Sequence, residues 1–302
     1  MDAVIRRCWA VFLLFIIAPA WADIALLVPE QNAQALSLKH ELQAQISEFA
    51  PEDTVRLAKA GTPAADAILN SNDLNFIIVV SARTLEQAVA HRRFPEGVPV
   101  VGIYLSRHDY LTYQDTLDSA IFVEPPIDRQ VALARQVFGK NESFGVLVNS
   151  VSDLRTTEKG LTLYPIDQYD SLNHALVRLL GENQALIGVY DPSLYSAENI
   201  KSILITSYRH NRALIGPSHA YLRAGALATT YSSASDIVRR LSELIRSSFS
   251  PEEELPKAGY NPYFRVGFND QVGRSLNLLL PEPEATAQNI KDELSRVGRE
   301  QK

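Results

Sequence analysis

The sequence predicts an α/β protein built from two doubly wound parallel-sheet lobes joined by a hinge. Short runs rich in Val and Ile alternate with amphipathic stretches along most of the 302-residue chain, which is the pattern of successive β-α-β units. Several of these runs are apolar throughout, as expected of parallel strands that helices cover on both faces. Glu124-Pro125-Pro126 interrupts the alternation, and this proline-marked passage indicates a crossing between two lobes.

The first lobe is predicted to contain parallel strands separated by short helices. After the first strand, residues 34–49 place apolar side chains three and four positions apart, which is one face of a helix. The last strand, at residues 120–123, leads into the proline-marked crossing. The other predicted strands cover residues 24–28, 54–57, 76–80 and 99–103, and the other helices cover residues 62–69 and 84–91.

The second lobe repeats the alternation, beginning with a helix at residues 129–138. Gly225-Ala226-Leu227 is expected to form a second crossing, because glycine and small residues suit a connection. A single barrel of eight β-α units would produce the same alternation, and no internal repeat separates the two arrangements. The remaining elements are strands at residues 144–148, 162–164, 185–190 and 213–215 and helices at residues 171–180 and 197–208.

These elements give a provisional division of the chain into domains. We expect the N-terminal lobe to combine residues 23–124 with about 227–258, and the C-terminal lobe to combine residues 125–226 with about 259–281. Residues 282–302 would follow as a tail or helix.

The N-terminus has the features of a cleavable export signal at residues 1–22. Two arginines precede an apolar run at residues 9–17, and Ala20-Trp21-Ala22 offers small residues at the cleavage site. The run is about half of the roughly 20 residues that a membrane-spanning helix needs, although a retained anchor is the alternative. The only cysteine, Cys8, falls inside this segment. The mature chain is therefore expected to be a soluble periplasmic protein without disulfides.

Composition and motif content argue against nucleic-acid binding and against catalysis. The formal net charge is −6 at pH 7, whereas a nucleic-acid-binding protein needs a basic face. The sequence has no G-x-S-x-G, P-loop or G-x-G-x-x-G motif, and its six histidines lack metal-ligand spacing. Ser218 precedes His219, but adjacent side chains rarely face one another, so they do not make a nucleophile and base. We therefore predict a binding protein with no cofactor and no metal, not an enzyme.

Several short segments recur in the order typical of one family of binding proteins. They are residues 76–81 (FIIVVS), 98–101 (VPVV), 124–130 (EPPIDRQ), 144–149 (FGVLVN), 225–228 (GALA), 266–269 (VGFN) and 275–281 (SLNLLLP). In this order, the chain resembles the substrate-binding proteins of ABC transporters of the tryptophan/tyrosine-permease type. These are members of the type I periplasmic-binding superfamily.

The resemblance implies two α/β lobes joined by three crossing segments, with a small ligand held in the cleft between them. The chain also departs from the family pattern beside that cleft. Eleven residues separate Asn149 from Leu161, where the family has a full helix and loop, and residues 106–110 replace an Asp-Pro segment after the fourth strand. The ligand can therefore differ from the aromatic amino acids of the family.

Candidate ligand contacts follow from the positions of the strand ends. In open parallel sheets, ligands bind outside the carboxyl ends of the strands, where loops and helix N-termini present unpaired N–H groups. The candidates at these positions are Ser81, Tyr104 and Ser106 in the first lobe and Asn149, Ser150, Tyr190, Asp191, Ser193, Ser218 and Tyr231 in the second.

These side chains have the chemistry to hold a small zwitterion, such as an amino acid or a related compound. Serine hydroxyls and neighbouring N–H groups would bind its carboxylate, Asp191 would accept its ammonium, and Tyr104 or Tyr190 would stack on its apolar part. Structural roles compete with these assignments. Ser81 can cap the following helix, Asp191-Pro192-Ser193 is a common turn sequence, and Tyr104 can be ordinary packing.

Two functional hypotheses follow from this interpretation. In the first, the protein closes its lobes around a small solute and delivers it to an ABC permease. In the second, the closed form reports the ligand to a membrane histidine kinase or cyclase. A third hypothesis, an exported hydrolase, would need a nucleophile, a base and an orienting residue that the sequence does not supply.

Overall fold

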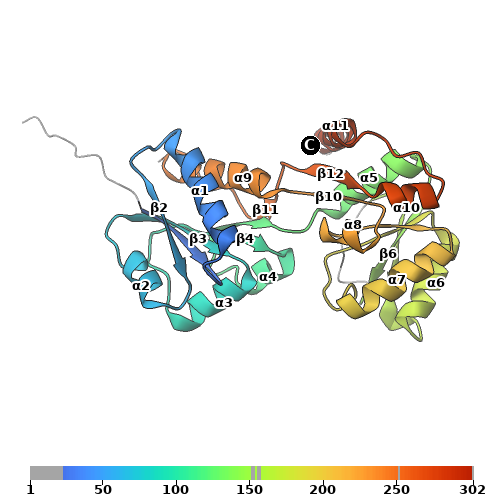
Figure 1. Ribbon diagram of the computed structural model, residues 1–302, viewed down its shortest axis with the longest axis horizontal. Coiled ribbons are helices and arrows are strands. Elements are labelled where there is room, and N and C mark those ends of the chain that lie inside the picture. The colour runs from blue at the N-terminus through green and yellow to red at the C-terminus, as the bar shows by residue number, and fades with distance from the viewer. Residues whose placement is uncertain (1–22, 151–153, 155–157, 251, 301–302) are drawn as a thin grey trace, which may run out of the picture.

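The protein consists of two α/β lobes, each built around its own six-stranded sheet (Figure 1). The computed structural model describes residues 23–150, 154, 158–250 and 252–300. The predicted export signal at residues 1–22, with Cys8, lies outside the described residues. Because the strands form two separate sheets, the single-barrel alternative is wrong. Within the described residues, none of the helices combines the length and the hydrophobicity needed to cross a bilayer.

Every neighbouring pair of strands in the first lobe is parallel. Leu26 and Leu27 point to opposite faces of an interior strand of the sheet, and both are fully buried, which explains why residues 24–28 are all apolar. The five strands predicted for this lobe are present, and a short sixth strand joins from much later in the chain. In sheet order they are β11 (Gly259–Tyr260), β5 (Ser119–Phe122), β4 (Val100–Leu105), β3 (Leu74–Val80), β1 (Asp23–Val28) and β2 (Thr54–Lys59).

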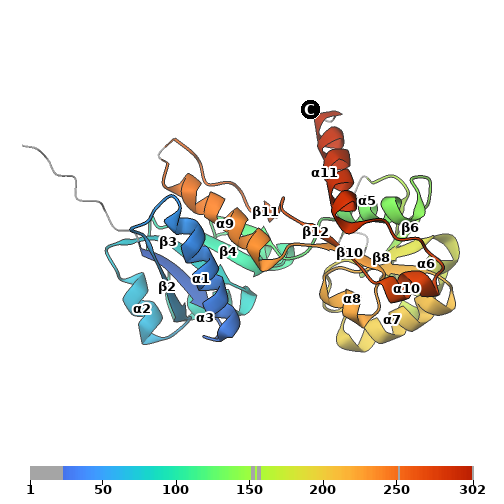
Figure 2. The same cartoon turned by 45° about the horizontal axis from the view of Figure 1, so that its top comes forward.

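Helices cover both faces of the first sheet. They are α1 (Ala33–Ser47) and α9 (Ala234–Ser248) on one face, α2 (Pro63–Leu69) and α3 (Ala82–His91) on the other, and α4 (Arg107–Thr112) after β4. Helices α1 and α9 lie side by side although they are far apart in the sequence (Figures 1 and 2). Leu42 of α1 and Leu241 of α9 are buried in one cluster with Leu26. Leu85 of α3 packs with Leu27 on the opposite face.

The second sheet is parallel except for β12, which is antiparallel to β10. Its strands in sheet order are β12 (Arg265–Phe268), β10 (Ala228–Tyr231), β9 (Ala213–Ile215), β8 (Ala185–Ile187), β6 (Phe144–Val148) and β7 (Leu161–Pro165). The predicted strand at residues 185–190 is therefore wrong at its carboxyl end. The chain leaves the sheet after Gly188, whose N–H still donates to the carbonyl of Ile215, and turns at Asp191.

Helices also cover both faces of the second sheet. They are α5 (Ile127–Phe138) and α11 (Pro283–Glu300) on one face, α6 (Leu172–Glu182) and α7 (Ala197–Arg209) on the other, and α8 (Ala220–Ala224), α10 (Asp270–Ser275) and η2 (Ile166–Gln168) in connections. Val131 of α5 and Ile290 of α11 are fully buried in one cluster. Leu176 of α6 and Ile203 of α7 are fully buried in the other.

Three segments connect the lobes, at residues 123–126, 232–233 and 261–264 (Figure 2). Two of the expected lobe boundaries need correction. Strand β10 belongs to the second sheet, so the range 227–258 begins too early for the first lobe, and β11 adds residues 259–260 to that lobe. The reason is that Gly225, with a φ of 118°, ends α8 in a left-handed cap and does not begin a crossing.

Hydrogen bonds tie the third crossing to the second crossing and to helices α5 and α9. The Arg129 guanidinium donates to the carbonyl of Asn261 at 2.9 Å, and the Asn261 side chain donates to the carbonyl of Asp236 at 3.0 Å. Ser232 donates through its hydroxyl to the carbonyl of Tyr263 at 2.7 Å. The second and third crossings are therefore bonded to each other, and the third is also bonded to α5 and α9, so the connections between the lobes are the natural position for a hinge.

An ion pair between Asp236 and Arg265 links the start of α9 to the start of β12. Arg265 Nε lies 2.9 Å from Asp236 Oδ2, which also accepts the N–H of Ser233 in a capping box. Burial alone would raise the pKa of Asp236, but hydrogen bonds from Arg265 and Ser233 hold it below its ordinary value. The carboxylate is therefore the form that the folded protein stabilises.

We expect Asp236→Asn to lower the free energy of unfolding at pH 7 by about 0.5–1 kcal/mol, since the pair is partly exposed. The Asp236 carboxylate contributes this stability in full above its unfolded-state pKa, about 3.9. The contribution disappears as the pH falls through the lower folded-state pKa. Urea unfolding of both proteins at pH 7 and at pH 3 measures this. A difference that stays the same at pH 3 would rule out an ionic origin.

Candidate functional site

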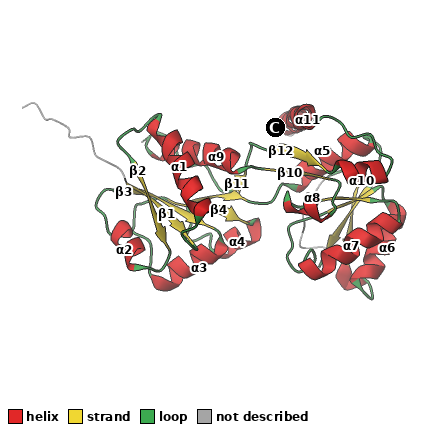
Figure 3. Ribbon diagram, in the orientation of Figure 1, coloured by secondary structure: helices red, strands yellow, loops and turns green. Residues whose placement is uncertain are grey.

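The candidate residues follow the strands of the two sheets at their carboxyl ends. Helices α4 and α8, which come after β4 and β9, lie on the sides of the lobes that face each other (Figures 1 and 3). Ser81, Tyr104 and Ser106 lie at this edge of the first sheet. Asn149, Ser150, Tyr190, Asp191, Ser193, Ser218 and Tyr231 lie at or just after the strand ends of the second.

Ser81 and Tyr104 end neighbouring strands in an unusual backbone conformation. The N–H of Ser81 donates to the carbonyl of Ile103 at 2.9 Å, so the two residues are adjacent across the sheet. Their φ angles are 79° and 55°, in the left-handed region that favours glycine. With a ψ of 156°, Ser81 occupies a region that is almost restricted to glycine. Backbone strain of this kind concentrates at functional sites.

The side chains of the first-lobe candidates differ in the hydrogen bonds and packing contacts that already engage them. Within the described residues Ser81 makes no helix-capping hydrogen bond, so the capping interpretation is wrong, and its Oγ lies 3.3 Å from Thr84 Oγ1. Ser106 is different: it caps α4, accepting the N–H of Asp109 at 3.0 Å and donating to its carboxylate at 2.7 Å. The Tyr104 ring packs against the first-lobe core, and burial, followed by the charge of Glu41, raises its pKa.

We expect the free energy of unfolding of Ser81→Gly to exceed that of Ser81→Ala by about 1–2 kcal/mol, because only glycine relieves the backbone strain. In an ordinary position the order would be reversed, since alanine has less backbone entropy to lose. Urea unfolding of the two variants gives the sign of the difference in their free energies of unfolding directly. An alanine variant as stable as the glycine variant would show that the position is not strained.

Three second-lobe candidates form one hydrogen-bonded group. The Asn149 side chain donates to Asp191 Oδ2 at 2.8 Å and to Ser193 Oγ at 3.0 Å. Asp191 Oδ1 accepts the N–H groups of Ser193 and Leu194 and the Ser193 hydroxyl. The Asp191 carboxylate therefore holds a turn, and most of its acceptor capacity is already used.

The other second-lobe candidates lie next to this group in the sequence or near the ends of β9 and β10. Tyr190 immediately precedes Asp191, and 45% of its surface is exposed. Ser150 continues the loop after Asn149. Ser218 begins the turn into α8, where its carbonyl accepts the N–H of Tyr221 at 3.1 Å. The Tyr231 ring stacks on His219 with ring centroids 4.1 Å apart, which gives it a packing role in this structure.

Glu124 is a further candidate for the site, although its sequence context predicted only a place in a crossing and in one of the family segments. Its Oε1 accepts the N–H of Arg107 at 2.7 Å, while its Oε2 is buried and has no hydrogen-bond partner within the described residues. Burial raises the pKa of this carboxyl, and Asp109 raises it further. The position of Glu124 just beyond the carboxyl end of β5 is the feature that could have identified it as a candidate from the sequence.

Charges of the first lobe act on Tyr190 of the second. Burial raises the pKa of Tyr190, and the negative charges of Asp109 and Glu124 add to the increase. Tyr260, on the short strand β11, experiences the same charge of Glu124 after the larger effect of burial. The negative charges of Asp109 and Glu124 in the first lobe therefore reach Tyr190 of the second.

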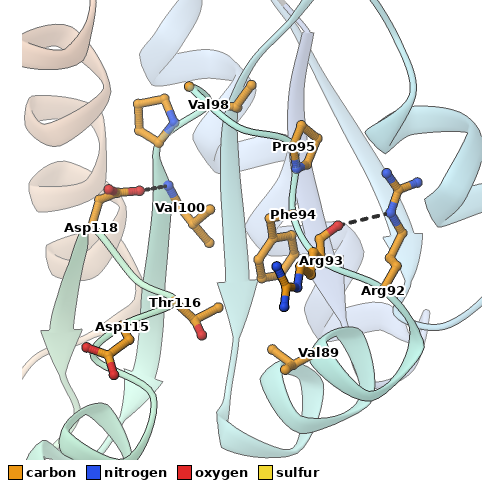
Figure 4. A pocket seen from close by; sticks show the side chains of 12 residues that line it. Val89, Arg92, Arg93, Phe94, Pro95, Val98, Val100, Asp115, Thr116 and Asp118 are labelled. Carbon is orange, nitrogen blue, oxygen red and sulfur yellow. Dashed lines mark hydrogen bonds between the residues drawn. The ribbon is translucent and has the colours of Figure 1, made fainter.

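Two cavities lie at the opposite edges of the sheets. One, of about 570 Å³, is next to the start of β4, where Asp118 accepts the N–H of Val100 at 2.7 Å and Arg92 donates to the carbonyl of Arg93 (Figure 4). The other, of about 270 Å³, is next to the start of β9. Their lining residues are distinct from the candidates. Among the described residues, no cluster of three or more His, Cys, Asp or Glu side chains could hold a metal ion.

No protein-family model and no curated protein matches the sequence. Solved structures do match. A ligand-free, open substrate-binding protein with adhesive properties from Clostridium difficile superimposes with a TM-score of 0.63 at 12% identity, covering 86% of this chain and 96% of that one. The chain has the fold of type I periplasmic binding proteins.

Two further structures show the same type I fold. An ABC domain in complex with L-Trp from Streptococcus pneumonia has a TM-score of 0.51 at 11% identity, covering 87% of this chain and 96% of that one. A chain of the XylFII–LytSN complex has a TM-score of 0.52 at 13% identity, covering 84% of this chain and 100% of that one. At these identities the likeness concerns the fold.

Proposed function

We propose that the protein is an exported solute-binding protein that captures a small molecule, such as an amino acid or a related compound, between its two lobes and delivers it to an ABC permease. The observation that carries this proposal is the set of polar and aromatic side chains at the carboxyl ends of both sheets, on the facing sides of two hinged lobes. In sheets of this kind, ligands bind at that edge.

The electrostatics favour a ligand with a cationic group. Asp109 and Glu124 together make the surroundings of Tyr190 negative, and Glu124 Oε2 has no partner among the described residues. Asp191, in contrast, uses its oxygens to hold its own turn. We therefore assign the ammonium of the ligand to Glu124, with Asp109 in support, and revise the earlier assignment to Asp191. Ser81 remains as a donor for a carboxylate, because the amide of Asn149 and the hydroxyl of Ser193 already donate within the Asp191 turn.

Closure of the lobes about the three crossings would bring the ligand contacts of both lobes together. Ligand contacts that exist only when both lobes meet would shift the population toward a closed form.

A ligand sensor for a membrane histidine kinase or cyclase is the second candidate function. Its support is the similarity to a chain of the XylFII–LytSN complex. Neighbouring genes discriminate between the two: permease and ATPase genes favour transport, and a sensor kinase gene favours signalling.

Thermal unfolding and calorimetry with a panel that includes the twenty L-amino acids test the proposal. One member of the panel should bind, and at 100 times its Kd it should stabilise the fold by about 2.7 kcal/mol. Failure of the whole panel, together with lobes fixed in one orientation, would contradict a solute-binding function.

A further inference from the structure

We propose that the second lobe holds a separate site for a phosphate group, in the cavity of about 270 Å³ between α7, α8 and α10. These three helices lie together on the second lobe in two views (Figures 1 and 2). The cavity borders the amino end of β9, whereas the interlobe candidates lie at the carboxyl ends. A ligand here is therefore independent of the solute held between the lobes.

The cavity concentrates positive charge. Arg212 and Arg223 both line it, and no Asp or Glu stands among its lining residues. Within the described residues neither guanidinium has an ion pair or a side-chain hydrogen bond. The surrounding sequence agrees, because residues 199–235 contain no acidic residue in a chain whose net charge is −6. Two unpaired guanidinium groups that share one cavity repel each other, and a bound anion would remove that repulsion.

Two polar atoms of the lining residues are also left without partners. Ser207 is 2% exposed, and its Oγ makes no hydrogen bond within the described part of the chain. Arg212 Nε is buried and equally unpaired there. Native proteins rarely leave buried donors unsatisfied, and an absent ligand is one of the few explanations for such a pair. The two guanidinium groups thus point to a missing anion, and the two unpaired buried groups belong to residues that line the same cavity.

The chemistry of the lining favours a phosphate group among anions. Guanidinium groups bind phosphate oxygens through paired N–H donors, and two of them balance a charge of about −2. The volume of about 270 Å³ equals roughly nine water molecules at about 30 Å³ each, enough for a phosphate and a short substituent. Tyr208, which is 62% exposed, stands beside the cavity and can cover that substituent. Free phosphate and a phosphomonoester lipid headgroup share this chemistry.

Isothermal titration with inorganic phosphate, in a phosphate-free buffer, tests the site. We expect saturable binding of one phosphate per chain, weakened at least tenfold in Arg223→Gln and more in the Arg212→Gln/Arg223→Gln double variant. Arg209→Gln is the matched control, because Arg209 is an exposed arginine of the same lobe outside the cavity lining. Its phosphate affinity should stay within twofold of wild type. Binding that persists in the double variant would overturn the proposal.

Binding to lipid vesicles distinguishes a lipid headgroup from free phosphate as the natural ligand of the site. Binding to phosphatidate vesicles and not to phosphatidylcholine vesicles, lost in the double variant and kept in Arg209→Gln, would assign the site to a lipid headgroup. If the protein binds neither phosphate nor phosphatidate, the site is refuted.

Ser207→Ala provides a test without any ligand: removing an unsatisfied hydroxyl should raise the thermal midpoint, and a lower midpoint would mean that the hydroxyl is already bonded.

Discussion

Replacing Gln130 by leucine is expected to lower the free energy of unfolding by about 2–4 kcal/mol. Gln130 is 1% exposed and lies in the first turn of α5. Its Nε2 donates to the carbonyl of Gly216 at 2.6 Å, and its Oε1 accepts the N–H and the hydroxyl of Thr230 at 3.0 and 2.8 Å. Leucine keeps the volume but leaves buried polar groups of β10 unsatisfied, and each such group costs about 1–3 kcal/mol.

Urea unfolding with an unchanged m-value is the measurement. Gln136→Ala on the same helix is the control. Within the described residues the Gln136 side chain accepts one exposed hydrogen bond, from Asn289 at 3.4 Å, so the expected change is within about 0.5 kcal/mol. Equal effects of the two substitutions would show that Gln130 does not join α5 to the second sheet.

Replacing Glu124 by glutamine is expected to weaken binding of a cationic amino-acid ligand roughly 10- to 100-fold, the equivalent of about 1.5–3 kcal/mol for a hydrogen bond to a charged group. The fold should change little in stability at pH 7, because glutamine keeps the acceptor for the N–H of Arg107 and removes a buried charge. A residue whose loss reduces binding while the fold is retained is a ligand contact.

The pH dependence separates this effect from simple loss of structure. Burial raises the folded-state pKa of Glu124 above its unfolded-state value, so the folded protein binds the proton more tightly. This contribution to stability is complete below the unfolded-state pKa, about 4.3, and is lost as the pH rises through the folded-state pKa. The stability of wild type relative to Glu124→Gln should therefore fall over that interval. A constant difference would mean that Glu124 is not buried as a carboxyl.

Much of the fold could be predicted because the central strands are buried on both faces. Such strands, as at Leu26 and Leu27, are apolar throughout and are easily recognised. Helix α9 was not predicted, although Leu241 and Ile245 show its apolar stripe. Its position in the first lobe, after a strand of the second, depends on packing against α1 and cannot be read from local sequence.

The candidate site could be located from the sequence but not resolved into roles. Strand ends identify Ser81 and Asn149, because position along a strand fixes which edge they occupy. Which of them is free depends on bonds that arise in three dimensions, such as the cap that engages Ser106 and the turn that engages Asp191. Glu124 shows the same limit, since its unpaired oxygen results from burial and not from its sequence motif.

The central claim is that two lobes close on a ligand about a hinge, and the distance between the lobes tests it most directly. Expression from Asp23 leaves no native cysteine, so exposed positions Glu86 on α3 and Ser202 on α7 can be changed to cysteine and labelled. Single-molecule energy transfer should show one predominantly open population without ligand and a shorter distance at saturating ligand. An unchanged distance at saturation would contradict closure.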